Sequence, residues 1–168
     1  MLINKLAKML EDNAEKLTEN WIAEITSNPS TKSYHKLGQT ELHDKVIAVY
    51  SNLKDWMNDT SRHSEFAKNF VNLGLKRKSQ KIELSEVIFA TILAKKNLIN
   101  YITTQGIFDS PLEMARQIEF VNQISTFFEK AMYFTALGYE ISDKKDKEHK
   151  SLVEDISISF WRSIVNKT

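Results

Sequence analysis

The residues of this chain that could carry chemistry are its histidines and carboxylates, because the sequence contains no cysteine. No two of the four histidines stand at the i, i+4 spacing that would place two imidazole ligands on one helical face. The glutamates lack the repeated Glu-x-x-His pattern of di-iron helical bundles. The sequence therefore predicts no metal centre and no cofactor. The histidines are His35, His43, His63 and His149.

Two of these histidines leave alternatives open. His43 lies beside an apolar stripe of a predicted helix and could ligate a haem iron, which some all-helical sensor folds hold. His63, followed by Ser64, Glu65 and Phe66 near a predicted helix start, is weakly similar to the phosphoacceptor histidines of two-component phosphorelays. For both residues, an ordinary solvated or core-edge histidine is the preferred interpretation.

Motifs for nucleotide binding and hydrolysis are absent. The sequence has no Gly-x-x-x-x-Gly-Lys loop, no Gly-x-Ser-x-Gly elbow and no Gly-x-Gly-x-x-Gly turn. Phosphate binding by a glycine-rich loop and hydrolysis by an activated serine thus lack support. We expect a protein that is not an enzyme.

A basic cluster at Lys76, Arg77, Lys78 and Lys81 could contact phosphate groups. It has no interleaved aromatic residues for base stacking, and the chain carries 23 basic against 22 acidic residues, a net charge of only +1. A solvated helix end is the preferred interpretation of the cluster. We expect no nucleic acid partner.

The longest nearly apolar run, residues 87–94, is far shorter than the roughly 20 residues that cross a bilayer. The first ten residues alternate apolar with polar side chains and resemble no export signal. We therefore expect a soluble, cytoplasmic protein without membrane insertion.

The elements that must position these residues are helices. Only four glycines and two prolines interrupt 168 residues, and the apolar 42% recurs at helical spacing. The pattern predicts an all-α fold, a single helical bundle of five to six helices. Helices are expected up to Asn28, from about Thr40 to Trp56 and around residues 66–73, with a loop over 27–39 anchored by Tyr34 and Leu37. The stripe of the first helix is Ile3, Leu6, Leu10, Ala14, Leu17, Trp21 and Ile25.

Two longer helices follow. Residues 84–101 have apolar side chains on more than one face, so this helix should be the most enclosed element. Ser110, Pro111 and Glu113 mark the start of the next helix with a cap, a first-turn proline and a capping box. Its predicted seam is Met114, Ile118, Val121, Ser125, Phe128, Met132 and Thr135.

These two helices also suggest an alternative to ordinary core packing. An apolar ligand or haem could lie between them, in a pocket formed by four residues. The four are Ile88, Ile92, Phe128 and Met132.

The chain divides into residues 1–140, a regulatory domain, and residues 141–168, a charged link followed by a C-terminal amphipathic helix. The apolar stripe of that last helix must be buried on its own domain or on a second copy of the chain. We predict that it contributes to an interaction surface. The residues concerned are Leu152, Ile156, Phe160, Trp161 and Ile164.

Several short segments resemble one known family in their order and spacing. They are residues 10–15 leading to Trp21, residues 34–37, residues 73–80 followed by 84–87, and residues 127–131 ending at 138–140. Together they make residues 6 to 140 similar to the N-terminal domain of RsbRD-type co-antagonists of the RsbT kinase, a bacterial sensor domain also found ahead of histidine kinases. Lys81 stands where this family is expected to have glycine.

The resemblance implies a non-catalytic input domain in stress or two-component regulation, acting on a kinase or a stressosome-type output protein. Related stressosome proteins have globin-like domains without haem, so a globin-like bundle is implied here too. Because no output domain follows within this sequence, we expect a homodimer that signals through a separate protein. The rival hypothesis is a small-molecule sensor that binds an apolar ligand or haem in its core.

Overall fold

The computed structural model describes residues 2–58, 60–104, 110–142, 156–160 and 162. Over these residues the fold is all-α, as predicted, and contains no strand. Residues 156–160 are also helical. The elements are α1 (Leu2–Ser27), the 3₁₀ helix η1 (Pro29–Lys36), α2 (Gln39–Asn58), the 3₁₀ helix η2 (Thr60–Arg62), α3 (His63–Ser79), α4 (Leu84–Thr104) and α5 (Pro111–Ile141).

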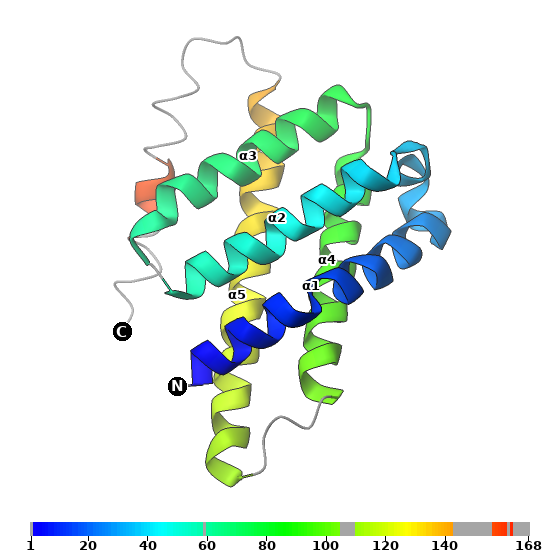
Figure 1. Ribbon diagram of the computed structural model, residues 1–168. Helices are drawn as coiled ribbons and strands as arrows, with labels where there is room; N and C mark the ends of the chain where they lie inside the picture. The colour runs from blue at the N-terminus through cyan, green and yellow to red at the C-terminus, as the bar shows by residue number, and fades with distance from the viewer. Residues whose placement is uncertain (1, 59, 105–109, 143–155, 161, 163–168) are drawn as a thin grey trace.

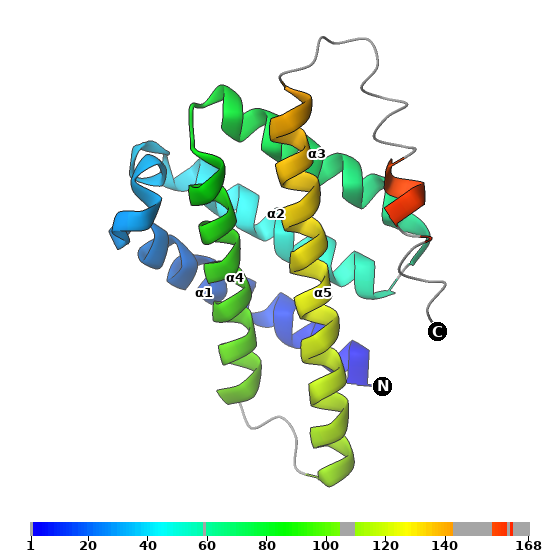
Figure 2. The same cartoon turned by 180° about the vertical axis from the view of Figure 1, so that it is seen from behind.

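The helices form two crossed layers. Helices α1, α2 and α3 run roughly side by side in front in Figure 1, and α4 and α5 cross behind them. Seen from behind, α4 and α5 form the front layer, and no other helix of the described chain covers their outer side (Figure 2). The core lies between the layers, where apolar faces of all five α-helices meet.

The first helix and its exit follow the sequence pattern closely. Leu10, Leu17, Trp21 and Ile25 are all buried, as the predicted stripe requires. The expected loop after it is instead the 3₁₀ helix η1, a correction with a local cause. The Asn28 side chain accepts a hydrogen bond from the backbone N–H of Ser30, and Pro29 supplies a helical φ at the first position.

The anchors and the best-marked cap are confirmed. Tyr34 is buried and Leu37 packs against the core from the end of η1. The Ser110 hydroxyl accepts a hydrogen bond of 3.2 Å from the backbone N–H of Glu113, which fixes the start of α5.

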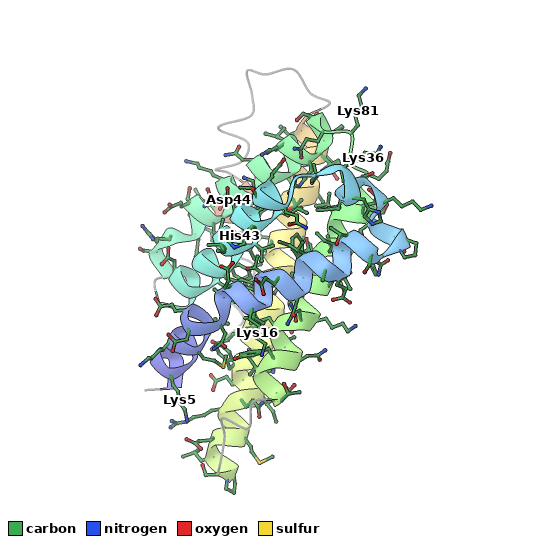
Figure 3. All side chains as sticks on the ribbon, turned by 45° about the vertical axis from the view of Figure 1, so that its right-hand side comes forward. Lys5, Lys16, Lys36, His43, Asp44 and Lys81 are labelled. Atoms are coloured by element: carbon green, nitrogen blue, oxygen red, sulfur yellow. The ribbon has the colours of Figure 1, made fainter. Side chains whose placement is uncertain are left out.

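Residues 76–78 of the basic cluster lie in the last turn of α3, because this helix continues through Ser79. A turn follows, where Lys81 has a φ of 58°, in the left-handed region that favours glycine. Its side chain projects away from the helices in Figure 3. Glycine adopts this backbone conformation without strain, which explains why the family is expected to have glycine here. This chain places a lysine in the same geometry.

Helices α3 and α5 cross at two glycines, Gly74 and Gly138. A Cβ on Gly74 would collide with the backbone carbonyl of Thr135, and one on Gly138 would collide with that of Val71. Only glycine allows two helix backbones to approach this closely. The crossing fixes the C-terminal half of α5 on α3.

The burial of the two long helices corrects two expectations. Helix α4 buries one face, but Ile92 is 43% exposed, and the most enclosed segment is the C-terminal half of α5. The predicted seam of α5 is only partly internal, since Phe128 and Thr135 are buried whereas Met114 and Ile118 are exposed. A second stripe makes the core contact instead, formed by Phe120, Ile124, Phe127, Ala131 and Phe134.

Candidate functional site

The described part of the molecule has an opening between α2 and α3. An open cleft of about 480 Å³ between them is lined by Lys45, Val49, Phe70 and Leu73, among others. The same four residues line a smaller internal cavity of about 50 Å³. The cavity reaches further inward to apolar side chains of α1, α4 and α5, and its polar boundary is formed by Tyr34 and Arg77. Its inner lining includes Trp21, Val87, Ala90, Ala94 and Phe128.

Arg77 is the central polar residue of this site. It belongs to the last turn of α3, one turn beyond the Gly74 crossing, and it is only 2% exposed. Its Nη1 lies 3.1 Å from a carboxylate oxygen of Glu41 and donates a 2.8 Å hydrogen bond to the side-chain oxygen of Gln80. The guanidinium carbon lies 5.3 Å from the centre of the Tyr34 ring. Its buried Nε has no hydrogen-bond partner within the described part of the chain.

Glu41, at the start of α2, is held by three groups from the end of α3. Besides Arg77, it accepts a 2.8 Å hydrogen bond from Gln80 and lies 3.0 Å from the Lys76 ammonium. The hydrogen bonds from Gln80 and then Lys76 lower the pKa of Glu41 to about 2. The carboxylate is therefore charged at any ordinary pH, and it links the start of α2 to the end of α3.

The same region includes the C-terminal end of α5. The Tyr139 hydroxyl donates a 2.8 Å hydrogen bond to the backbone carbonyl of Ile82, and the Lys78 ammonium donates one of 2.8 Å to the carbonyl of Tyr139. Burial raises the pKa of Tyr34 to about 12 against a smaller lowering effect of Arg77, and burial also raises that of Tyr139. We call the group formed by Tyr34, Glu41, Arg77, Gln80 and Tyr139 the polar junction.

The interpretation of the basic cluster as a solvated helix end is corrected for Arg77, which is buried. Lys76 pairs with Glu41, and Lys78 binds the end of α5. These three cations are thus engaged within the domain. The sequence did contain one signal: Phe66, Phe70 and Arg77 share the buried face of α3 at helical spacing.

The four residues predicted to form a ligand pocket do not surround one cavity. Only Phe128 lines the internal cavity. Ile88 and Met132 are half-buried, and Ile92 is on the surface. Because the Lys95 ammonium lies 3.6 Å from the Glu129 carboxylate, the antiparallel helices α4 and α5 place Ile92 at about the level of Met132. Ile92 thus lies on the outer side of the α4–α5 pair and not in the core.

His43 also lies away from the cavity. Its Nε2 is 2.8 Å from a carboxylate oxygen of Glu15 on α1, in a surface groove between α1 and α2 (Figure 3). The hydrogen bond to Glu15 raises the pKa of His43. The cavity lining contains no histidine, so the residues described there do not fit haem ligation. Over the described residues, no group of three or more metal-ligating side chains occurs.

His63 is the first residue of α3 and is half-buried there. Its suggested phosphoacceptor role stays a prediction.

Part of the C-terminal segment packs on the domain itself. The Phe160 ring stacks on Tyr133 with a centroid distance of 4.8 Å and an interplanar angle of 14°. It also meets Phe134 edge-on at 5.3 Å. Ile156 packs against the core cluster as well. Leu152, Trp161 and Ile164 lie outside the described residues, so their role in an interaction surface stays a prediction.

One known family matches most of the chain. The model of the family described as "Histidine kinase N terminal" matches residues 3–140. The chain belongs to this family, which confirms its resemblance to N-terminal sensor domains of the RsbRD and histidine kinase type. No curated protein and no solved structure matches the chain. Within the described residues, none of the helices has the length and apolar character needed to span a bilayer.

Proposed function

We propose that this histidine-kinase-type N-terminal domain is a non-catalytic input module that acts through protein–protein interaction. It binds a second copy of the chain, and it acts on a kinase or a stressosome-type signalling protein. The observation that carries the proposal is the predicted seam of α5, which is apolar but faces outward over its first half. Met114 is 58% exposed and Ile118 is 66% exposed.

The seam continues along one side of α5, where it is bordered by Glu129, which pairs with Lys95 of α4. Positions 114, 118, 121, 125 and 132 fall within about 60° of each other around an ideal helix. The stripe also includes half-buried residues, namely Val121, Ser125 and Met132. Ile92 of α4 extends it at the end near Met132. We call these residues the outer stripe. They are Ile92, Met114, Ile118, Val121, Ser125 and Met132.

A second copy suits this stripe better than an unrelated chain for a geometric reason. The stripe lies on an antiparallel helix pair, so a twofold axis would set two α4–α5 pairs face to face as a four-helix bundle. Each apolar residue would then meet apolar residues of the same stripe. An apolar surface bordered by a charged pair such as Lys95 and Glu129 is typical of an interface.

The mass of the protein in solution tests this proposal. Sedimentation velocity of the wild-type chain should give twice the chain mass of 19.5 kDa. Replacing Ile118 with glutamate should weaken the dimer at least about a hundredfold, because each copy then buries an unpaired charge.

Arg116→Glu provides the control. Arg116 is exposed on the same turn of α5 but lies about 160° around the helix from Ile118. This variant should remain a dimer. A wild-type monomer at all concentrations, or equal dissociation of both variants, would contradict the proposed interface.

A second function is favoured by one observation: the α2–α3 cleft and the apolar internal cavity share four lining residues. An apolar ligand that entered there would contact Phe70 and Leu73 and end beside the polar junction. It would widen a cavity that holds only about 50 Å³ in the present structure.

Native mass spectrometry of the freshly purified protein distinguishes the two functions. A reproducible extra mass that is lost on Ala94→Phe, which fills the cavity, would support the ligand sensor. A chain that carries no added mass, before and after incubation with a lipid extract, would leave only the interaction module.

A further inference from the structure

The cleft between α2 and α3 is bridged at both of its ends. At one end, a carboxylate oxygen of Glu41 lies 3.1 Å from Arg77 and 3.0 Å from Lys76. At the other end Arg62, which directly precedes α3, donates a 3.0 Å hydrogen bond to Asp55 near the end of α2. The two helices run side by side between these links (Figure 1). The two bridges therefore set the spacing of the helices that form the walls of the cleft.

The floor of the cleft is apolar. Phe70 is buried, and Val49 and Leu73 are half-buried. On α3 the lining extends from Asn69 to Lys76, about 10 Å along the helix. Because an extended chain advances about 3.3 Å per residue, about three residues of a bound segment fit along this wall. The floor can hold an apolar side chain of such a segment.

The polar groups that line the cleft are cations and amides. Among the described residues they are two lysines, Lys45 and Lys76, and two asparagines, Asn69 and Asn72, with no carboxylate. Lys76 is paired with Glu41. Lys45, in contrast, is half-buried, forms no ion pair with a described residue, and lines both the cleft and the internal cavity. A partly desolvated ammonium without a counter-charge attracts an anionic group.

The two asparagines add a feature that suits a peptide. Asn69 and Asn72 are exposed, about one turn apart on α3, and both line the cleft. Neither side-chain amide is hydrogen-bonded within the described part of the chain. Each carries N–H donors and a carbonyl acceptor, the same groups that a peptide unit offers, so the amides can bind the backbone of an extended segment. A purely apolar ligand would leave them unused.

We propose that the α2–α3 cleft binds an extended segment of the signalling partner in which an acidic side chain stands next to an apolar one. The carboxylate pairs with Lys45, and the apolar side chain lies on Phe70 and Leu73. The backbone of the segment binds Asn69 and Asn72. This inference rests on the proposed action through a protein partner, and it names the chemistry of that partner.

A phage-displayed library of random decapeptides, selected on the immobilised full-length chain, tests the inference. The enriched sequences should share an acidic residue next to an aliphatic or aromatic one. A fluorescent peptide with the consensus sequence is then titrated against wild type and variants by anisotropy. Lys45→Glu should weaken binding at least about tenfold, because the charge that meets the carboxylate is reversed. Lys45→Arg, which keeps the charge, should bind nearly as well as wild type.

Two further variants make the result specific. Lys16→Glu is the matched control, because it changes the net charge equally at an exposed position of α1 outside the cleft lining (Figure 3). It should leave the peptide affinity unchanged. Asn69→Ala combined with Asn72→Ala tests the amides without a change of charge and should weaken binding at least about tenfold.

Three results would overturn the proposal. They are a library without a shared acidic and apolar motif, equal effects of Lys45→Glu and Lys16→Glu, and a double-alanine variant that binds as tightly as wild type. If the chain selects no peptide but carries an added mass in native mass spectrometry, the cleft serves a small ligand and the inference is wrong.

The sedimentation mass separates this inference from the proposed dimer. Lys45 lies on the helix layer opposite the outer stripe, so Lys45→Glu should keep the mass of wild type (Figures 1 and 2). A dimer that selects no consensus peptide would refute the docking site alone. A monomeric wild type that binds the peptide through Lys45 would refute the dimer alone.

Discussion

The two halves of α5 are built for different tasks. The C-terminal half lies against α3 through the Gly74–Gly138 crossing and ends in the polar junction. The first half projects beyond the end of α4 in Figure 2 and presents Met114 and Ile118 to solvent. One helix thus has a fixed end and an open end. A regulatory domain needs both, because a signal must be carried by a rigid element and received by a free surface.

Gly74→Ala tests the fixed end with the largest expected effect. The new methyl group would collide with the carbonyl of Thr135, so α3 and α5 must separate along the crossing. We expect a loss of roughly 3 kcal/mol in the free energy of unfolding. Urea titration measures it, with Gly38→Ala as control because nothing lies near that position. An equal effect of both substitutions would show that the crossing is not tightly packed.

Arg77→Met tests the polar junction at nearly constant volume. The substitution leaves Glu41 with only Lys76 and Gln80, and it removes the cation beside Tyr34. Because Glu41 is partly solvated, we expect a moderate loss of about 2 kcal/mol. Lys68→Met, on the exposed face of α3, should change stability by less than about 0.5 kcal/mol. If Arg77→Met leaves the free energy of unfolding unchanged, the polar junction does not stabilise the domain.

Lys130, in the fixed half of α5, should make stability depend on pH. It is 4% exposed, and burial lowers its pKa to about 8 from an ordinary 10.5. Between these two values the unfolded chain binds the proton that the folded chain has lost, so the contribution of Lys130 to stability rises with pH. We expect a gain of about 1 kcal/mol from pH 8 to 9.5, below the range in which the buried tyrosines with a raised pKa oppose it. The gain should disappear in Lys130→Met, and its persistence there would assign it to another group.

Lys81→Gly should give the smallest effect, and a favourable one. Glycine relieves the left-handed backbone at φ 58° but adds freedom to the unfolded chain. We expect a net gain of about 0.5 kcal/mol in unfolding free energy. Lys78→Gly, inside α3, should instead lose about 2 kcal/mol, because it lowers helix propensity and also removes the hydrogen bond to the Tyr139 carbonyl. A loss at both positions would mean that Lys81 makes a compensating contact.

The sequence predicted the helices well because their signals are local. The stripe from Leu10 to Ile25 and the Ser110 cap depend on residues within a few turns of each other. The register of α5 could not be predicted in the same way. That helix carries two apolar stripes, and only the packing of α3 and α4 decides that the one with Phe127 faces inward and the one with Ile118 faces outward.

The site was harder to predict for a similar reason. Arg77 stands between two lysines in the sequence. Its burial depends on contacts with Glu41 of α2 and with Gln80 in the turn after α3. Ile92 is apolar and belongs to an apolar helix, so it was expected in the core. It lies instead on the flank of α4 that meets no other described helix. The burial of Arg77 and the exposure of Ile92 both depend on how helices that are distant in the sequence pack together.

A single introduced cysteine tests the central claim most directly, because the chain has none of its own. Cysteine at Ile118 or Val121, in the outer stripe, should form an intermolecular disulfide under mild oxidation and run as a dimer on a non-reducing gel. Cysteine at Arg116, on the opposite side of the same helix from Ile118, should stay monomeric on that gel. Efficient cross-linking at Arg116 with none along the stripe would contradict the account of α5 as a helix with one fixed end and one end open to a second copy.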